Sequence, residues 1–459
     1  MNPTLTLDDP RYLNLHSLTC YNGVLLVRDA NGRPKQMPFG NALRDSLSPQ
    51  TQRRAARTYM RDQANEGTGA LAGYAFGIRT REWALLTGKE LAARGWNAEQ
   101  ALAMAKHALM SLGIVFGTKD NTANLTKVLI FAAQNAHETM ADVIERHREV
   151  LEPWLTDVQK VLAAKTKAKD KKTAAEDTSA EPDAKIPALP AAAARELLAA
   201  LSPADAIDIA LYGRFLAGLP ADDVDGAVQT MTAITVGRAA GVEDFYSAAD
   251  DMKLLRKATP RQAGTHALDL FEPSADNGAG MTGYQNLISG TFYAHSVLDR
   301  HKLRTSLAAH AGDTFDVEAA AQAAEAAFID AFCHAVPSAK RNTSAAPGVL
   351  PKFVLVHADK RQHNYVGAFE KAIEERTSQD GTQAASLQAA ERLLDHHALI
   401  IRKRGIDPGT ALTYDLDIAD LLQQRRDAGR LQPTEVDTPD QLAHPTTAIG
   451  EQLLAGQPT

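Results

Sequence analysis

The strand-like segments of this 459-residue chain are few and lie far apart, and this spacing limits the fold more than any other feature. Residues 12–19 alternate apolar and polar side chains, which is typical of a half-buried strand. Two more candidate strands are residues 287–297 and 353–357, and residues 226–251 mix helical and extended character. The helical patterns between them are residues 98–112, 124–147, 190–215, 317–335 and 386–402. The pattern predicts an α+β core carrying long insertions and not a doubly wound sheet.

Composition excludes several protein classes. Hydrophobic residues make up 44% of the chain and charged residues 23%, which is enough apolar material for a sizeable core. The two cysteines, Cys20 and Cys333, are too few for a disulfide framework or a four-thiolate zinc site. The first ten residues lack the basic and apolar regions of a signal peptide, and no run approaches the roughly 18 apolar residues of a membrane span. We therefore expect a cytoplasmic protein.

One short segment is basic although the whole chain is acidic. The net charge is −7, yet residues 27–57 hold seven basic and two acidic side chains, so the segment carries 7 − 2 = +5 and the remainder −12. The seven basic residues are Arg28, Arg33, Lys35, Arg44, Arg53, Arg54 and Arg57. A single basic patch on an acidic body favours binding to a polyanion at one place.

The second half of this segment has the pattern of a helix that begins at Ser48-Pro49 and runs to about residue 62. Arg53 and Arg57 are four residues apart, so their side chains lie about 5–6 Å from each other on one helix face. We expect free N–H groups in the first turn to favour an anion. Arg28 and Lys35 could add phosphate contacts that do not depend on base sequence. From charge alone, an ordinary solvated helix face explains these residues about equally well.

Other motifs give weaker signals. Residues 278–283 match the dinucleotide-binding pattern of glycines, but a strand pattern follows them where a helix is needed, so we expect no cofactor. His137-Glu138 resembles the start of a zinc-protease helix, but Ala141 stands where the second histidine belongs, so we expect no metal. Phe245, Tyr246, Met281 and Tyr284 lie beside glycines and acidic residues, where they could stack on bases or simply fill the core.

Six segments in this order resemble the backbone subunit of the type I-E CRISPR Cascade complex (the CasC family). They are LNLHSLTCYNGVLLVRDANGRPKQMPFG (13–40), SPQTQRRAAR (48–57), DIALYGRF (208–215), GVEDFYSAADD (241–251), GYQNLISGTFYAH (283–295) and VPSAKRNTSAA (336–346). None of them is diagnostic by itself, and their common order is the stronger signal. Departures such as Val27, Asn41, Ser46 and Pro49 indicate a divergent member.

The resemblance implies an RRM-like, ferredoxin-type palm with a large helical finger insertion and a protruding thumb. The implied divisions are palm at 1–60, finger insertion at 61–190 with a flexible linker at 165–185, palm return at 191–240, thumb and extended loop at 241–285, second part of the palm at 286–430 and a flexible tail at 431–459. In this family, several copies polymerise along one CRISPR guide RNA, together with other Cascade subunits, and the guide then pairs with target DNA. The implied role is non-catalytic.

The resemblance also implies roles for individual residues. The positions that match contacts to the RNA backbone are Arg28, Lys35, Ser48, Gln50, Arg53, Arg57 and Lys340. The positions that match apolar wedges against displaced bases are Phe215, Tyr246 and Met281. Residues 254–277 form a longer connection than the family usually has.

Two other function classes compete with this interpretation. Related proteins in other CRISPR classes cleave bound RNA with an acidic residue in the loop after the first strand, and Asp29 occupies a comparable loop. That alternative is a guide-directed, metal-dependent RNA endonuclease, but a lone carboxylate rarely holds a catalytic metal, so we favour a role for Asp29 in ordering its loop. The third class is a monomeric RNA-binding module that forms no filament.

Overall fold

The computed structural model describes residues 10–74, 76–172, 187–201, 207–214, 224–249, 251, 279–310, 315–340, 342–374, 376–378 and 381–442. The chain forms two compact units. The first, here the helical unit, contains Met1–Leu13, Arg57–Gln229 and Val297–Phe328. The second, here the sheet unit, contains Asn14–Ala56, Thr230–Ser296 and Ile329–Thr459.

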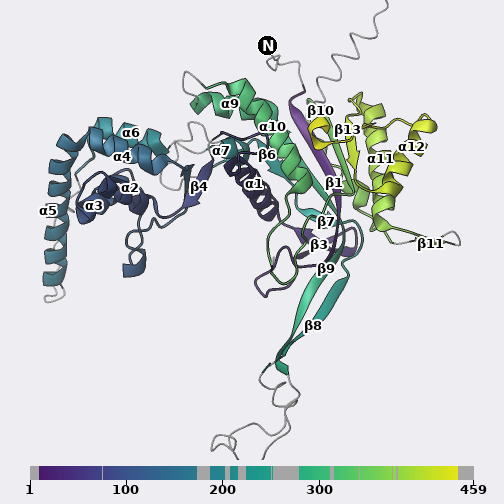
Figure 1. Ribbon diagram of the computed structural model, residues 1–459, viewed down its shortest axis with the longest axis horizontal. Helices are drawn as coiled ribbons and strands as arrows, with labels where there is room; N and C mark the ends of the chain where they lie inside the picture. Colours follow the sequence, from purple (N-terminus) through teal and green to yellow (C-terminus); the bar gives the residue numbers. More distant parts are fainter. Residues whose placement is uncertain are drawn as a thin grey trace, which may run out of the picture. The chain divides into compact units, whose positions relative to one another are not determined.

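A large mixed sheet dominates the sheet unit (Figure 1). Its strands are β1 (Tyr12–Val24), β2 (Gln36–Phe39), β3 (Ala42–Leu47), β7 (Ala233–Thr235), β8 (Gly241–Ala249), β9 (Ala279–Asp299), β10 (Phe353–Asp359), β13 (Thr410–Thr413) and β14 (Thr434–Glu435). Their order is β14-β13-β10-β1-β9-β7-β3-β2, with β8 paired to β9 beside this path, and the short strand β6 (Val228–Thr230) also pairs with β9 as the tenth strand of the sheet. The pairs β10–β13 and β7–β9 are antiparallel, whereas β13–β14 is parallel. The expected α+β class is confirmed.

Helices α11 (Ala385–Arg404) and α12 (Leu416–Asp427) cover β10 and β13 in the sheet unit. Leu393 and Leu422 from these helices pack in one apolar cluster with Phe353 and Leu355 of β10. The shorter elements nearby are the 3-10 helix η4 (Val366–Phe369), the two-stranded ribbon of β11 (Arg376–Ser378) and β12 (Gly381–Gln383), and α13 (Pro439–Leu442). The sequence predicts both β10 and α11 nearly to their bounds.

The helical unit is built mainly from α-helices (Figure 1). Its elements are β4 (Gly77–Thr80), α2 (Trp83–Ala93), α3 (Ala98–Ser111), the 3-10 helix η1 (Asp120–Thr122), β5 (Ile130–Ala133), α4 (Ala136–Arg146), α5 (Arg148–Lys172), α6 (Ala191–Leu201), α7 (Ile207–Tyr212), β6 (Val228–Thr230) and α9 (Arg300–His310). Trp83 is fully buried in its apolar core, and the indole N–H donates to the Ile130 carbonyl at 3.1 Å.

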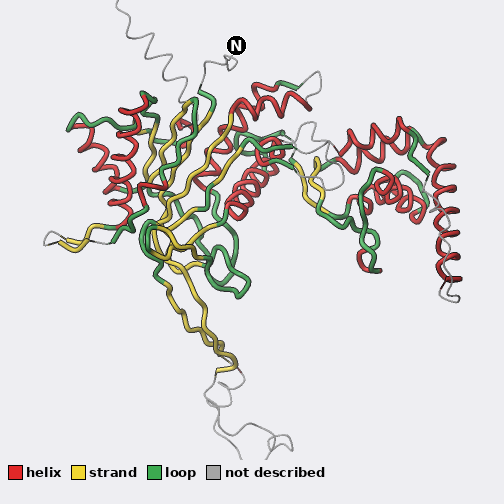
Figure 2. Tube along the Cα trace, turned by 180° about the vertical axis from the view of Figure 1, so that it is seen from behind, coloured by secondary structure: helices red, strands yellow, loops and turns green. Residues whose placement is uncertain are grey.

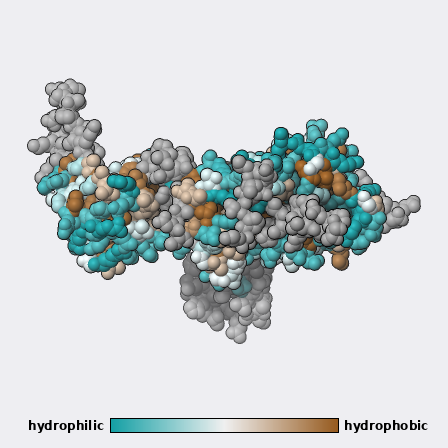
Figure 3. Space-filling view, turned by 90° about the horizontal axis from the view of Figure 1, so that it is seen from above, coloured by the Kyte–Doolittle hydropathy of each residue, from teal (hydrophilic) through white to brown (hydrophobic). Residues whose placement is uncertain are grey.

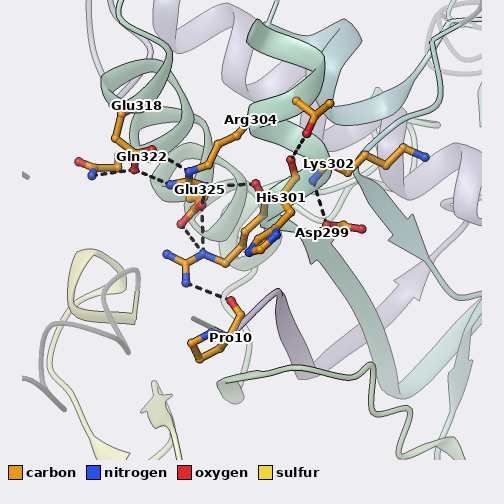
Figure 4. A network of polar contacts seen from close by, with 10 residues as sticks. Pro10, Asp299, His301, Lys302, Arg304, Glu318, Gln322 and Glu325 are labelled. Atoms are coloured by element: carbon orange, nitrogen blue, oxygen red, sulfur yellow. Dashed lines mark hydrogen bonds and ion pairs between the residues drawn. The ribbon is translucent and has the colours of Figure 1, made fainter. Parts of the chain in front are cut away.

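Two helices pass from one unit to the other along the chain. They are α1 (Pro49–Asn65), which begins in the sheet unit, and α10 (Val317–His334), which begins in the helical unit. Within the helical unit, α9 and α10 share a buried ion-pair network (Figure 4). Arg300 and Arg304 both bind Glu325, and Arg304 also binds Glu318 at 2.7 Å. Each buried charge therefore has a partner of opposite sign.

Three predicted segments differ from the structure. Residues 124–147 do not form one helix, because strand β5 pairs with β4 before α4 begins, and its four residues are buried on both faces. Residues 226–251 are extended wherever they have regular structure up to Ala249. Residues 165–172, predicted as linker, continue α5, because Lys and Ala favour helix. The rest of that linker, the 254–277 connection and the tail beyond residue 442 lie outside the described residues.

Strand β1 is buried on both faces and not on one, which corrects the half-buried prediction. It lies between β10 and β9, so its polar side chains face the interior as well as its leucines. His16 stacks on Tyr365 with ring centroids 4.3 Å apart and on His295 at 4.6 Å. The His16 ring nitrogen Nδ1 also lies 2.9 Å from the Tyr293 hydroxyl oxygen. This polar stack sits inside the sheet unit.

Tyr365 extends the stack toward α11. Its hydroxyl oxygen lies 2.9 Å from Nδ1 of His397 and 3.2 Å from Nε2 of His357. Burial lowers the pKa of His295 and of His397 to about 4, and it lowers the pKa of His16 and His357 well below the usual value. The histidines of this stack are therefore neutral at pH 7.

The face of the molecule drawn in Figure 3 is mostly polar where its residues are described. In the space-filling view, the described surface is largely hydrophilic, and apolar patches on it are small and scattered (Figure 3). No helix among the described residues combines the length and the apolar composition that a bilayer span requires.

Candidate nucleic-acid interface

The basic loop after β1 is shaped by Asp29. Its Oδ1 accepts the backbone N–H groups of Asn31 and Arg33 at 2.8 and 2.9 Å. The backbone N–H of Asp29 donates to the Arg33 carbonyl, and Arg28 forms a bridge with Pro34. This tight turn leaves the side chains of Arg28 and Arg33 exposed. The loop-ordering role expected for Asp29 is therefore present in its hydrogen bonds.

Helix α1 begins next to the end of that loop. The backbone N–H and the hydroxyl of Ser46 both donate to the Lys35 carbonyl, at 2.9 and 3.2 Å. The Gln52 amide nitrogen donates to the carbonyls of Leu47 and Met231, at 3.0 and 2.9 Å. Gln52 thus fixes the first turn of α1 against the sheet. No pattern in the sequence indicates this role, although Gln52 lies two residues after the predicted contact Gln50.

The first turn of α1 has fewer free donors than predicted. The Ser48 carbonyl accepts the backbone N–H groups of Thr51 and Gln52, and the Ser48 hydroxyl lies 2.8 Å from that of Thr51. Pro49 has no N–H to offer. An anion at this point would consequently depend more on side chains than on the helix terminus.

One apolar cluster brings three predicted RNA-contact segments together in the sheet unit. It contains Val27, which directly precedes the basic loop, and Leu47, which lies just before α1; Val336 and Val349 pack against it. The last two flank the loop that carries Lys340. Because these segments share one core, the basic loop, the start of α1 and the Lys340 loop lie at the same end of the sheet.

The predicted side chains at this end differ in exposure. Arg28, Lys35 and Gln50 are exposed, whereas Arg53 and Lys340 are half-buried. Nε of Arg53 is buried without a hydrogen-bond partner among the described residues. Lys340 has a positive φ of 55°, and its carbonyl accepts the N–H groups of Thr343 and Ser344. The segment that includes Arg28, Lys35 and Arg53 therefore keeps a cationic surface.

Arg44 does not belong to that surface, which corrects the prediction of a uniform basic patch. Its side chain is fully buried in the sheet unit. Nη1 donates to the carbonyls of Thr235 and Val236 at 2.7 and 2.8 Å, and Nη2 donates to that of Phe369 at 3.0 Å. Burial lowers the pKa of Arg44. One guanidinium group thus joins strand β7 to the η4 segment, and the exposed charge of the basic segment is smaller than the sequence count.

Arg57 belongs to the helical unit. Its guanidinium carbon lies 4.8 Å from the centroid of the Phe131 ring on β5. The side chain is half-buried, unlike the exposed neighbour Arg54. Arg57 therefore has a defined position and is not simply part of a solvated helix face.

Strands β8 and β9 form a hairpin that projects from the sheet (Figure 2). Tyr246 lies opposite Gly283, and Met281 lies opposite Ala248, so the two predicted wedges share one face. A side chain at Gly283 would meet the Tyr246 ring at 2.6 Å, so glycine is needed there. Tyr246 and Met281 are 41% and 60% exposed, which is unusual for core residues. The third predicted wedge, Phe215, lies outside the described residues.

The opposite face of the hairpin carries a second exposed pair. Phe245 and Tyr284 lie directly opposite each other, with ring centroids 5.3 Å apart.

Residues 279–283 belong to strand β9, which confirms that no helix follows the glycine-rich motif. Among the described residues, no group of three or more His, Cys, Asp and Glu side chains is arranged to hold a metal ion.

Comparisons with known proteins agree on one group. A family model described as "CT1975-like protein" matches residues 13–400. A chain of a solved structure described as "CRISPR RNA-guided surveillance complex, pre-nicking" is similar at 25% identity and a TM-score of 0.68, covering 95% of this chain and 99% of that one. A chain of a "CRISPR RNA-guided surveillance complex" matches at 23% identity and a TM-score of 0.61, with the same two coverages. No curated protein matches.

Proposed function

The chain belongs to the CT1975-like protein family, and we propose that it is a CRISPR RNA-binding subunit of a Cascade-type surveillance complex. The observation that carries this proposal is the similarity, at 25% identity, to a surveillance-complex chain along nearly the whole length of both chains. More specifically, we propose the backbone subunit of the type I-E complex, the CasC family, acting in the cytoplasm. The six sequence segments in family order support this assignment.

We propose that the sheet is the RRM-like palm of this family. Strand order β10-β1-β9-β7 supports it, since numbering these four strands along the chain gives the ferredoxin-type order 4-1-3-2. Helix α1 follows β1, and α10 lies between β9 and β10, as the βαββαβ pattern requires. The helices between α1 and β7 are then the finger insertion, and the β8–β9 hairpin is the thumb.

In this proposal, the protein holds the guide RNA by its phosphates. Arg28, Lys35, Gln50 and Arg53 offer cationic and polar groups at one end of the sheet, with Ser48 and Lys340 beside them. Such contacts position a strand without reading its bases. Sequence recognition is then left to base pairing between the guide and target DNA.

The thumb hairpin would separate bases at intervals along the guide. Tyr246 and Met281 are exposed on one face of an extended hairpin, and aromatic side chains there can stack on bases. A periodic displacement requires one hairpin for each interval, so we propose that copies of the chain assemble side by side on one guide.

We propose that the subunit is not a nuclease. The backbone N–H groups of Asn31 and Arg33 both donate hydrogen bonds to Oδ1 of Asp29, and these bonds support a loop-ordering role for Asp29. The test is to incubate the assembled complex with complementary RNA and Mg²⁺. We expect no cleavage, whereas regularly spaced cuts that Asp29→Ala abolishes would establish the endonuclease instead.

The function itself is tested by co-expressing the chain with a CRISPR array and the other complex subunits. We expect the purified protein to carry RNA of uniform length, identified by its absorbance and by sequencing as processed guides. The matched control omits the array. Protein that purifies without nucleic acid even at low ionic strength would overturn the proposal.

A further inference from the structure

A small ribbon in the helical unit carries charges that the proposed function has not used. Strands β4 and β5 pair with Arg79 directly opposite Phe131 and Gly77 opposite Ala133, so these four residues share one face. Arg79 is exposed. A side chain on Gly77 would approach the Phe131 ring to 2.5 Å, so glycine here allows the ring to lie across the ribbon.

Arg57 covers the same phenylalanine ring. Its guanidinium carbon is 4.8 Å from the ring centroid, within the range of a cation–π contact. Phe131 is only 6% exposed, so the ring supports Arg57 and leaves little face for a base. Burial lowers the pKa of Arg57, and the nearby positive charges of Arg79 and Arg61 lower it further. The guanidinium group of Arg57 thus lies over the Phe131 ring, and Arg79 lies directly opposite Phe131 in the ribbon.

One buried carboxylate opposes these charges. Asp208 is fully buried, and its Oδ1 accepts the Gly77 backbone N–H at 2.9 Å. Its Oδ2 is buried without a hydrogen-bond partner among the described residues. The negative charge of Asp208 raises the pKa of Arg57, whereas burial raises the pKa of Asp208 itself to about 6. Asp208 is therefore placed to hold Arg57 in position.

Among the residues that the structure describes here, the charges of Arg57, Arg79 and Asp208 do not balance without a further anion. Arg57 and Arg79 supply two positive charges and ionised Asp208 one negative charge, while Arg61 has its own partner in Asp62 at 3.3 Å. The surplus is one positive charge, and a phosphodiester group carries one negative charge. Guanidinium groups bind phosphate oxygens through paired N–H donors.

We propose that Arg57 and Arg79 form a clamp for one phosphodiester group of a nucleic-acid strand, with Asp208 as the positioning residue for Arg57. The proposal deepens the proposed function and rests on it only in assuming that a strand reaches the helical unit. It adds Arg79 to the binding residues and gives Arg57 a defined partner. The guide RNA and the target DNA strand both offer this chemistry.

The test compares Arg79→Gln with Arg195→Gln, because both remove one exposed positive charge from the same unit, the second on helix α6. Binding is measured against salt concentration in two arms, guide RNA to the full chain and target DNA to the guide-loaded complex. The binding constant K falls as salt rises, and we expect Arg79→Gln to make this fall less steep. The magnitude of the slope of log K against log salt should decrease by about 0.7 in the arm whose strand occupies the clamp. Arg195→Gln should leave both slopes unchanged.

Further variants separate charge from geometry. Arg79→Lys keeps the charge, so it should restore the slope but bind less tightly than the wild-type chain, because a single ammonium cannot bind two phosphate oxygens in parallel. Asp208→Asn keeps an acceptor for Gly77 but removes the charge that holds Arg57 in position, so it should weaken binding even though a negative charge is lost. Unchanged or tighter binding would contradict the positioning role of Asp208. Thermal unfolding of each variant checks that the fold is intact.

Equal slopes for Arg79→Gln, Arg195→Gln and the wild-type chain in both arms would overturn the clamp while leaving the proposed function in place. If the wild-type chain retains no guide, the proposed function fails. The same variants are then compared on single-stranded RNA and DNA of unrelated sequence. A slope reduced only by Arg79→Gln would still support the clamp, and equal slopes, or no binding, would overturn it.

Discussion

The helical unit and the sheet unit bury different kinds of side chain. The large apolar cluster of the helical unit contains Trp83, Leu91 and Met104, and the buried Arg300 of this unit is paired with the buried Glu325. The sheet unit buries His16, His357 and the guanidinium of Arg44 beside its apolar clusters. An apolar core tolerates changes that preserve its volume, whereas a buried polar group depends on particular partners. The difference teaches that the sheet unit should be sensitive to loss of the Arg44 guanidinium, whose described hydrogen bonds all go to carbonyls, and to acid, which charges its buried histidines.

Arg44→Gln should have the largest effect on stability. Removing the guanidinium leaves several buried carbonyls of β7 and η4 without donors, so we expect the free energy of unfolding to fall by about 3–5 kcal/mol. The matched control is Arg54→Gln, an exposed residue of the same segment, which should change it by less than about 0.5 kcal/mol. Urea denaturation measures both. Equal midpoints for the two variants would remove the distinction between the buried and exposed arginines.

Acid should destabilise the sheet unit through its histidines. The folded pKa of His295 and of His397, about 4, lies below the unfolded value of 6.5, so the unfolded chain binds more protons between these limits. Stability is therefore complete above about pH 6.5 and falls as the pH decreases toward 4. At pH 5.5 the two residues together should cost about 3 kcal/mol. A free energy of unfolding that stays constant from pH 7 to pH 5 would contradict this account.

Replacing Arg53 and Arg57 with alanine should weaken guide binding equally for all guide sequences. Each lost phosphate contact reduces the salt slope by about 0.7 to 1. The single variants separate binding from stability. Arg57→Ala also removes the contact with Phe131, so it should lower the free energy of unfolding by about 0.5–1 kcal/mol. Arg53→Ala should leave the free energy of unfolding unchanged. Salt titrations and thermal unfolding measure the two effects. Unchanged affinity in the double variant would exclude α1 from the RNA path.

Tyr246→Ala should have the smallest effect on affinity, but it should change the pattern in which the bound guide is protected from nuclease. The overall binding constant should stay nearly unchanged, because the phosphate contacts remain, while the periodic nuclease protection of the guide is altered. Phe245→Ala, on the opposite face of the hairpin, is the matched control. An identical footprint for Tyr246→Ala and the wild-type chain would show that the wedge assignment is wrong.

Periodic segments of the chain could be predicted well from sequence. Helices α1, α3, α10 and α11 and strand β10 lie within a few residues of their predicted bounds, because repeated apolar positions mark them. Strand β5 was missed, because four buried residues in a row have no alternation to distinguish strand from helix. Strand β10 is buried on both faces as well, but its run FVLVH is rich in β-branched valine, which favours a strand.

Side-chain partners from distant parts of the chain could not be predicted. The sequence places Arg44 among the surface charges, since nothing near it in sequence shows that carbonyls about 190 and 325 residues away surround it. The same holds for Arg79 and Asp208, which tertiary pairing alone associates with Arg57. In contrast, Arg28, Lys35 and Gln50 were identified as candidate contacts from sequence, and the structure leaves all three exposed.

Assembly of several copies on one guide is the central claim, and native mass spectrometry of complexes with guides of increasing length tests it most directly. We predict that the mass rises in steps of one chain, 49.4 kDa, each time the guide gains one full interval. A complex that contains a single copy of the chain at every guide length would contradict the account.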